Sequence, residues 1–97
     1  MIQSFRGKGT EEVFHGKTSK VARKTVPGDL MVNARRKLDQ LNQAARLDDL
    51  RAPPGNMLEP LKGDRRGQHS IRINDQYRVC FVWTDAGPEQ VEIVEYH

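Results

Sequence analysis

The sequence predicts an α+β fold in which two or three N-terminal helices pack on one face of a mainly antiparallel sheet. Helical periodicity is confined to the first half of the chain, whereas the second half alternates between apolar and polar residues. Turn-forming residues interrupt the second half at short intervals, which is typical of consecutive antiparallel strands. Helices followed by a run of strands favour α+β over an alternating parallel architecture. The length of 97 residues predicts one domain, 1–97.

The N-terminal third predicts a short strand, a short helix and a loop. Ile2–Phe5 is the expected strand. Thr10 is the expected N-cap of a helix that ends at Phe14, and two glutamates suit the positive end of its dipole. Residues 15–28 are polar and basic with little apolar periodicity, so they predict a loop or a frayed segment.

The longest helix is expected after Asp29, a good N-cap. Residues 47–50 add a further turn, and the sequence APPGN at 52–56 ends helical structure because proline cannot continue it. The apolar stripe of this helix recurs at three- and four-residue intervals and comprises Met31, Ala34, Leu38, Leu41 and Ala45.

The rest of the chain predicts four antiparallel strands. A turn at Gly63–Gly67, a loop at 74–76 and a turn at 85–88 separate them. The expected strands are Met57–Lys62, Ser70–Asn74, Tyr77–Trp83 and Gln90–Tyr96.

The two central strands share one apolar face only in a particular register. If Ile73 sits opposite Tyr77 across a three-residue loop, Ile71 faces Val79, and Arg72 lies beside its partner Arg78 on the other face. Like charges opposite each other destabilise a strand pair, so such an arrangement favours a site for an anion. Two solvated arginines on an open sheet face are an equal alternative, and a two-residue turn would separate them.

Charge is unevenly distributed. All 16 lysines and arginines precede residue 81, whereas four of the 13 acidic residues follow it, and the net charge is +3. The basic residues 1–80 favour a polyanionic partner such as nucleic acid, although many small proteins have a basic surface. No apolar run predicts a membrane span or a signal peptide, and Cys80, the single cysteine, predicts a buried small apolar residue in a reducing compartment. We therefore expect a cytoplasmic protein without a membrane partner.

Metal-ligand spacing, a phosphate-binding glycine loop and a hydrolase triad are all missing from the sequence, which predicts neither a metal site nor a cofactor. A different set of motifs covers nearly the whole chain. It comprises the start Met1–Ile2–x–Ser4–Phe5, the segment Leu58–x–Pro60–Leu61–x–Gly63–x–Arg65, the segment Ser70–Ile71–Arg72–Ile73–Asn74–Asp75–Gln76–Tyr77–Arg78, and the end Glu95–Tyr96–His97. In this order and spacing the chain resembles the HigB-type toxins of the RelE/ParE superfamily.

The resemblance implies a RelE-like fold of the microbial ribonuclease type and a toxin that cuts mRNA in the ribosomal A site. It also implies a cognate helix-turn-helix antitoxin of the HigA type. The positions that match the family's site are Lys62, Arg72, Arg78, Tyr96 and His97. Glu95 matches an acid that precedes the Tyr–His pair. Glu59 departs from the family, where this position is often histidine.

These residue types suit RNA cleavage without a metal, in which the 2′-hydroxyl attacks the adjacent phosphate. The guanidinium groups of Arg72 and Arg78 match the charge of the phosphorane, and Lys62 adds a point charge. His97 is the natural acid or base, Tyr96 stacks on a base or orients the hydroxyl, and Glu59 or Glu95 serves as base or orienter. The residues expected to bind RNA are Lys62, Arg65, Arg66 and His69. His69 lies at a strand start and is expected to be either structural or at the rim of the substrate site.

Two other functions remain open from the sequence. A ParE-like protein would inhibit DNA gyrase without catalysis, and such a protein has no need for an acid–Tyr–His end facing two arginines. A nucleic-acid-binding module would bind RNA with a steep salt dependence and would not cleave it.

Overall fold

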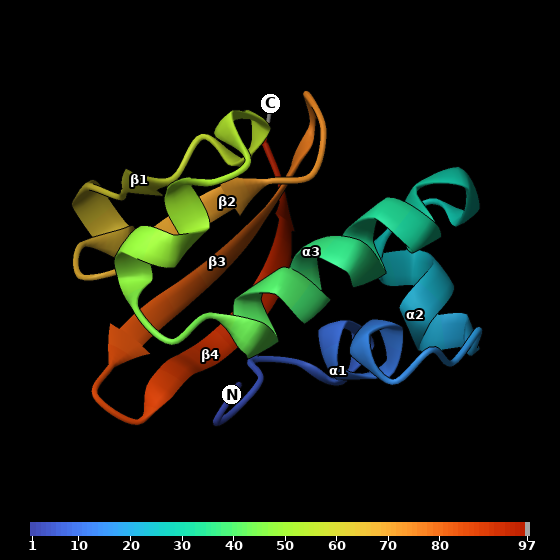
Figure 1. Cartoon of the computed structure of the whole chain (residues 1–97). Helices are drawn as coiled ribbons and strands as arrows, with labels where there is room; N and C mark the ends of the chain where they lie inside the picture. Colours follow the sequence, from blue (N-terminus) through green and yellow to red (C-terminus); the bar gives the residue numbers. More distant parts are fainter. Residues whose placement is uncertain (97) are drawn as a thin grey trace.

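Four strands form one antiparallel sheet in the order β1–β2–β3–β4 in the computed structural model, which describes residues 1–96 (Figure 1). The strands are β1 Glu59–Pro60, β2 His69–Arg72, β3 Tyr77–Thr84 and β4 Gly87–Glu95. All strand pairs are antiparallel, as the alternation of the second half predicts.

The helices lie on one face of this sheet and beside it. α3 (Met31–Gln43) crosses the sheet, and α1 (Lys8–Phe14) and α2 (Lys20–Thr25) lie next to it on the β4 side (Figure 1). The remaining turns are 3₁₀ helices, namely η1 Gly28–Leu30, η2 Leu47–Arg51, η3 Pro54–Asn56 and η4 Gly63–Arg65. The α+β prediction is confirmed. None of the helices in residues 1–96 is both long and apolar enough to cross a membrane.

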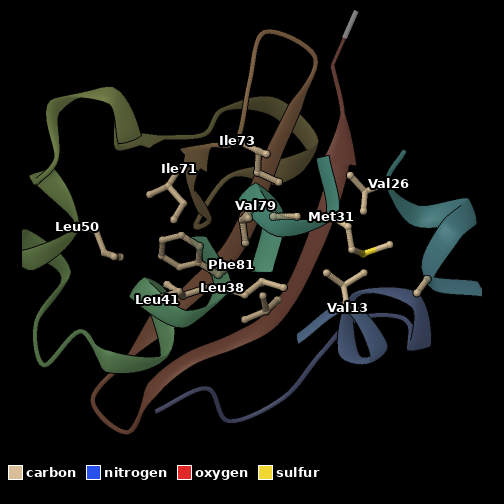
Figure 2. Close-up of a cluster of buried hydrophobic side chains, with 13 residues drawn as sticks. Val13, Val26, Met31, Leu38, Leu41, Leu50, Ile71, Ile73, Val79 and Phe81 are labelled. Carbon is tan, nitrogen blue, oxygen red and sulfur yellow. The ribbon is translucent and has the colours of Figure 1, made fainter. Parts of the chain in front are cut away.

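The core forms where the apolar stripe of α3 meets the sheet (Figure 2). Burying a large apolar side chain contributes roughly 1.5–3 kcal/mol, so this layer supplies most of the stabilisation. Its fully buried members include Ala34, Leu38 and Leu41 from α3, and Ile71, Val79, Phe81 and Val91 from the strands. The stripe is as predicted except for Ala45, which lies beyond the end of α3 and is exposed.

The predicted caps of the first and last helices are wrong. α1 begins at Lys8, so Thr10 lies inside it, buried, and its Oγ1 accepts a hydrogen bond from the Ile93 N–H at 3.0 Å. Asp29 is exposed within η1, and α3 begins at Met31 without a side-chain cap. In both places tertiary contacts and a preceding 3₁₀ turn override the local capping preference.

The predicted loop at 15–28 is also wrong, because it contains α2. Ser19 caps this helix, and its Oγ accepts a hydrogen bond from the Ala22 N–H at 3.2 Å. Ala22 and Val26 are buried. Two apolar residues four positions apart are enough to bury one side of a short helix. They produce little periodicity, which explains why the sequence pattern is weak.

Three predicted strands are shorter than expected, and one of them is β2, which ends at Arg72 and not at Asn74. In place of a strand at 2–5, Phe5 forms an isolated parallel bridge with Val91, and the Gln3 N–H donates to the Pro88 carbonyl at 2.8 Å. β1 is reduced to two residues because Met57 has a left-handed backbone (φ 47°), which no extended strand permits.

The predicted register of the central strands is confirmed. Ile71 pairs with Val79 and Arg72 pairs with Arg78. The Ile73 N–H donates to the Tyr77 carbonyl at 2.9 Å and closes the loop at 74–76. Its first residue, Asn74, accepts hydrogen bonds at Oδ1 from the N–H groups of the two residues that follow Asp75.

Candidate functional site

The face of the sheet opposite the helices carries the polar residues of the central strands. Ile71 and Val79 point into the helix-covered core, so strand alternation turns their neighbours to the other face. This second face, which we call the arginine face, carries Ser70 and Arg72 from β2, Arg78 and Cys80 from β3, and Glu92 and Val94 from β4.

Arg78 is held at three points on the arginine face. Its Nε donates to Ser70 Oγ at 2.7 Å and its Nη2 donates to the Met57 carbonyl at 2.8 Å. The Glu59 carboxylate lies 3.5 Å from Nη2, and the Arg78 side chain is only 12% exposed. Because two neutral acceptors fix the guanidinium, its direction does not depend on the exposed carboxylate.

Arg72 lies directly across the strand pair from Arg78. Its Nη2 pairs with Asp75, whose side chain is 88% exposed, and its Nη1 lies 3.6 Å from Met57 Sδ. An ion pair with such an exposed partner contributes about 0–1 kcal/mol. An incoming anion can therefore displace Asp75 at low cost.

Tyr96 covers the end of the arginine face nearest Arg78. The centre of its ring is 6.0 Å from the guanidinium carbon of Arg78, and its backbone N–H donates to the Gln76 carbonyl. Burial, and then the neighbouring thiol of Cys80 at 4.0 Å from Oη, raise the pKa of Tyr96. The phenol is therefore protonated at neutral pH and acts as a hydrogen-bond donor or a stacking surface.

Cys80 lies beneath Tyr96 and is fully buried, as predicted. Burial raises the pKa of its thiol. A protonated, inaccessible thiol is a poor nucleophile, so Cys80 has a packing role here.

Arg65 reaches the arginine face from η4 and is bound to Glu92 by a hydrogen bond and ion pair of 2.8 Å. This hydrogen bond raises the pKa of Arg65, and Arg6 lies 3.7 Å from the same carboxylate. Of the other residues expected to bind RNA, Lys62 and Arg66 are exposed beside η4.

Two predicted site residues lie on the helix side of the sheet. His69 pairs with Phe81 and stacks on its ring at 6.4 Å, and its buried Nδ1 has no hydrogen-bond partner among residues 1–96. Glu95 pairs with Tyr77, and alternation from Ile93 places it on that side as well. The predicted role of His97 falls outside the described residues.

The arrangement therefore brings Arg72, Arg78, Tyr96 and Glu59 together and adds residues that the sequence analysis did not select. Ser70 and Met57 hold Arg78, and Glu92 holds Arg65. Within the described part of the chain the surface has no enclosed pocket, and no three His, Cys, Asp or Glu side chains form a set suited to a metal ion. The site is an open cationic surface flanked by an aromatic ring.

Comparison with known proteins gives the family of the chain. A model of the HigB-like toxin family, described as the RelE-like toxin of type II toxin–antitoxin system HigB, matches residues 3–97. Toxin HigB-1 of Vibrio cholerae is 52% identical over 50 residues, which are 52% of this chain and 53% of that protein. An uncharacterized protein of Haemophilus influenzae is 39% identical over 56 residues, which are 58% of this chain and 55% of that protein. The match thus spans about half the length of each curated relative.

The fold is also shared with a solved structure. The YoeB-YefM complex from Staphylococcus aureus contains a chain that superposes with a TM-score of 0.60 at 14% identity, over 100% of this chain and 98% of that chain. This similarity confirms the predicted fold type.

Proposed function

Because the chain belongs to the HigB-like family of RelE-like type II toxins, we propose that it is an endoribonuclease that cleaves mRNA in the ribosomal A site. Such cleavage inhibits translation. The observation that carries the proposal is the pair Arg72 and Arg78, side by side across β2 and β3, with the Tyr96 ring next to them. Since the family model spans 3–97, we take residues 1–97 as one toxin domain that acts in the cytoplasm, where its ribosomal target lies.

The chemistry is attack of a 2′-hydroxyl on the adjacent phosphate, with loss of the 5′-oxygen and no metal. The pentavalent phosphorane carries additional negative charge, and a preoriented guanidinium stabilises it because no reorganisation is needed during the reaction. Arg78 meets this requirement through its bonds to Ser70 and Met57. Arg72 supplies a second planar cation once the phosphate displaces Asp75.

The described residues offer no strong base for the proton of the 2′-hydroxyl. The raised pKa of Tyr96 excludes a tyrosinate base at neutral pH, and a carboxylate such as Glu59 is a weak base there. Positioning of the RNA for in-line attack must then lower much of the barrier, and an ordered A-site codon provides it. His97 completes the proposal as the acid or base, and Glu95 keeps at most an orienting role from the far face.

We therefore expect almost no cleavage of free RNA and efficient cleavage of ribosome-bound message with 5′-hydroxyl ends. Glu59→His should raise cleavage on the ribosome by at least about tenfold, because an imidazole titrates near neutral pH. Glu59→Gln is the matched control and should change the rate little. The measurement is primer extension on programmed ribosomes with each purified variant. If both variants lose activity, Glu59 is the working base, and rapid cutting of naked RNA would refute the dependence on positioning.

A second assay, in cells, separates this function from inhibition of gyrase. Brief expression in cells should stop incorporation of labelled amino acid before that of labelled thymidine. The reverse order would favour a gyrase inhibitor, and RNA binding without new 5′ ends would favour a binding module.

A cognate antitoxin with a helix-turn-helix domain is the proposed partner, because the family consists of toxins of toxin–antitoxin systems. The structural neighbour was likewise solved as a YoeB-YefM complex. The exposed basic residues of α2, Lys20, Arg23 and Lys24, are the proposed contact for an acidic antitoxin segment. A deletion of 17–24 would remove the buried Ala22 and disturb the fold, so charge reversal is the better test.

Changing all three α2 residues to glutamate should weaken the antitoxin complex about tenfold or more, mainly by slowing association, and should reduce its salt dependence. Arg51→Glu is the control, since Arg51 is an exposed cation on η2. Surface plasmon resonance at two salt concentrations measures both rates. Equal affinities of the triple variant and the parent chain would remove α2 from the interface.

A further inference from the structure

Met57 is an exposed apolar side chain at the edge of the arginine face. It is 55% exposed, and among residues 1–96 only Met1, Val21 and Val32 are comparable large apolar residues at the surface. Its Sδ lies 3.6 Å from Arg72 Nη1, and its carbonyl accepts the hydrogen bond from Arg78. Met57 therefore contacts both arginines of the proposed site.

The position of Met57 is fixed by the segment that precedes it. Its backbone is left-handed (φ 47°), a conformation that is unusual for a residue other than glycine, and its N–H donates to the Pro54 carbonyl at 3.1 Å. The preceding Asn56 is completely buried and hydrogen-bonded to the backbone of Leu50 and Ala52. The backbone of Met57 is therefore held between a buried anchor and Arg78.

Two apolar groups thus flank the two guanidinium groups. The thioether of Met57 lies against Arg72, and the ring of Tyr96 lies near Arg78. A nucleotide chain has the complementary pattern, with an anionic phosphate between two bases whose flat faces can stack. We propose that Met57 is a specificity-determining residue that receives the base on one side of the scissile phosphate, while Tyr96 receives the base on the other side.

The inference rests on the proposed nuclease function and adds the base contact. A thioether is polarisable and flexible, so it adapts to the face of either purine or pyrimidine and makes more contact with the larger ring. Met57 should therefore favour a purine at the position that it contacts. Loss of the thioether should reduce this preference without removing the phosphate-binding arginines.

The test is a double-mutant cycle on ribosomes programmed with synthetic mRNA that carries an abasic nucleotide at each A-site codon position in turn. Met57→Asn removes the apolar group and retains a residue type that tolerates a left-handed backbone, and Met57→Leu keeps an apolar side chain. Val32→Ala is the matched control, because Val32 is 63% exposed on α3. Binding of a 2′-O-methyl message and cleavage of the unmodified message are both measured.

For the parent chain and Met57→Leu, loss of the base at one particular position should cost about tenfold in binding, within the range known for base stacking. The same loss should cost Met57→Asn almost nothing, and Val32→Ala should behave like the parent. Equal penalties for Met57→Asn and the parent at every position would overturn the inference while leaving the nuclease intact. If the parent chain neither binds nor cleaves the message, the proposed function itself fails.

Discussion

Arg78→Ala is expected to abolish growth inhibition when the chain is expressed in bacteria. The guanidinium is preoriented by Ser70 Oγ and the Met57 carbonyl, and it faces the position of the phosphorane in the proposed site. Removing one preorganised donor of this kind typically costs about 10²–10³ in rate. Cleavage of ribosome-bound message, followed by primer extension, should fall by at least that factor.

Two further variants separate the catalytic role of Arg78 from a structural one. Arg78→Lys keeps the charge but loses the planar fork, so it should fold and retain only a small part of the activity. Arg51→Ala, at an exposed arginine on η2, should have no effect. Because the Arg78 side chain is only 12% exposed, Arg78→Ala should also cost about 1–3 kcal/mol of stability through the acceptors left without a donor. An Arg78→Lys variant that folds and remains fully toxic would exclude the proposed role.

Asn56→Ala is expected to lower the free energy of unfolding by about 2–4 kcal/mol, the largest stability effect of any single polar change that we predict. Asn56 is completely buried, and its Nδ2 lies within hydrogen-bonding distance of Leu50 O (3.1 Å), Ala52 O (3.3 Å) and Gln40 Oε1 (3.2 Å). Its Oδ1 accepts a hydrogen bond from Lys37 Nζ. Burial, and then the neighbouring charge of Arg36, lower the pKa of Lys37.

Urea denaturation of Asn56→Ala and of the control Asn33→Ala measures this effect. Asn33 is exposed on α3, so its replacement should change stability by less than about 0.5 kcal/mol. Asn56→Ala should also lose cleavage at temperatures where it is still folded, because Asn56 anchors the segment that carries Met57 and Glu59. A loss of stability below about 1 kcal/mol would show that water replaces the amide at this position.

Strand alternation and helical periodicity predicted the sheet, its central register and the core stripe, because these features follow from local patterns of apolar residues. The same alternation, carried one step further, places His69 with Ile71 and Glu95 with Ile93 on the helix side. The sequence contains this signal. The resemblance to a family rests on residue identity, which does not say on which face of the sheet each residue lies.

Other features left no such signal. Arg78 donates a hydrogen bond to the backbone carbonyl of Met57, a residue with a left-handed backbone. Neither a side-chain type nor a residue spacing predicts such a contact. In the sequence Ser70 is an ordinary serine of a strand, and its role as a hydrogen-bond acceptor for Arg78 is visible only in the structure. α2 was not predicted because only Ala22 and Val26 mark its buried side, and periodicity does not reveal its packing against α1.

The segment 3–6 can bind its partners on β4 only after nearly the whole described chain has been synthesised. The Gln3 N–H and the Arg6 N–H bind carbonyls of Pro88 and Val91, which the ribosome adds more than 80 residues later. Arg78 and Tyr96 also follow the segment 3–6 by a long stretch of chain. Contacts of such large sequence separation also slow folding. In the proposed function, this slow folding gives the antitoxin an interval in which to bind before the site is complete.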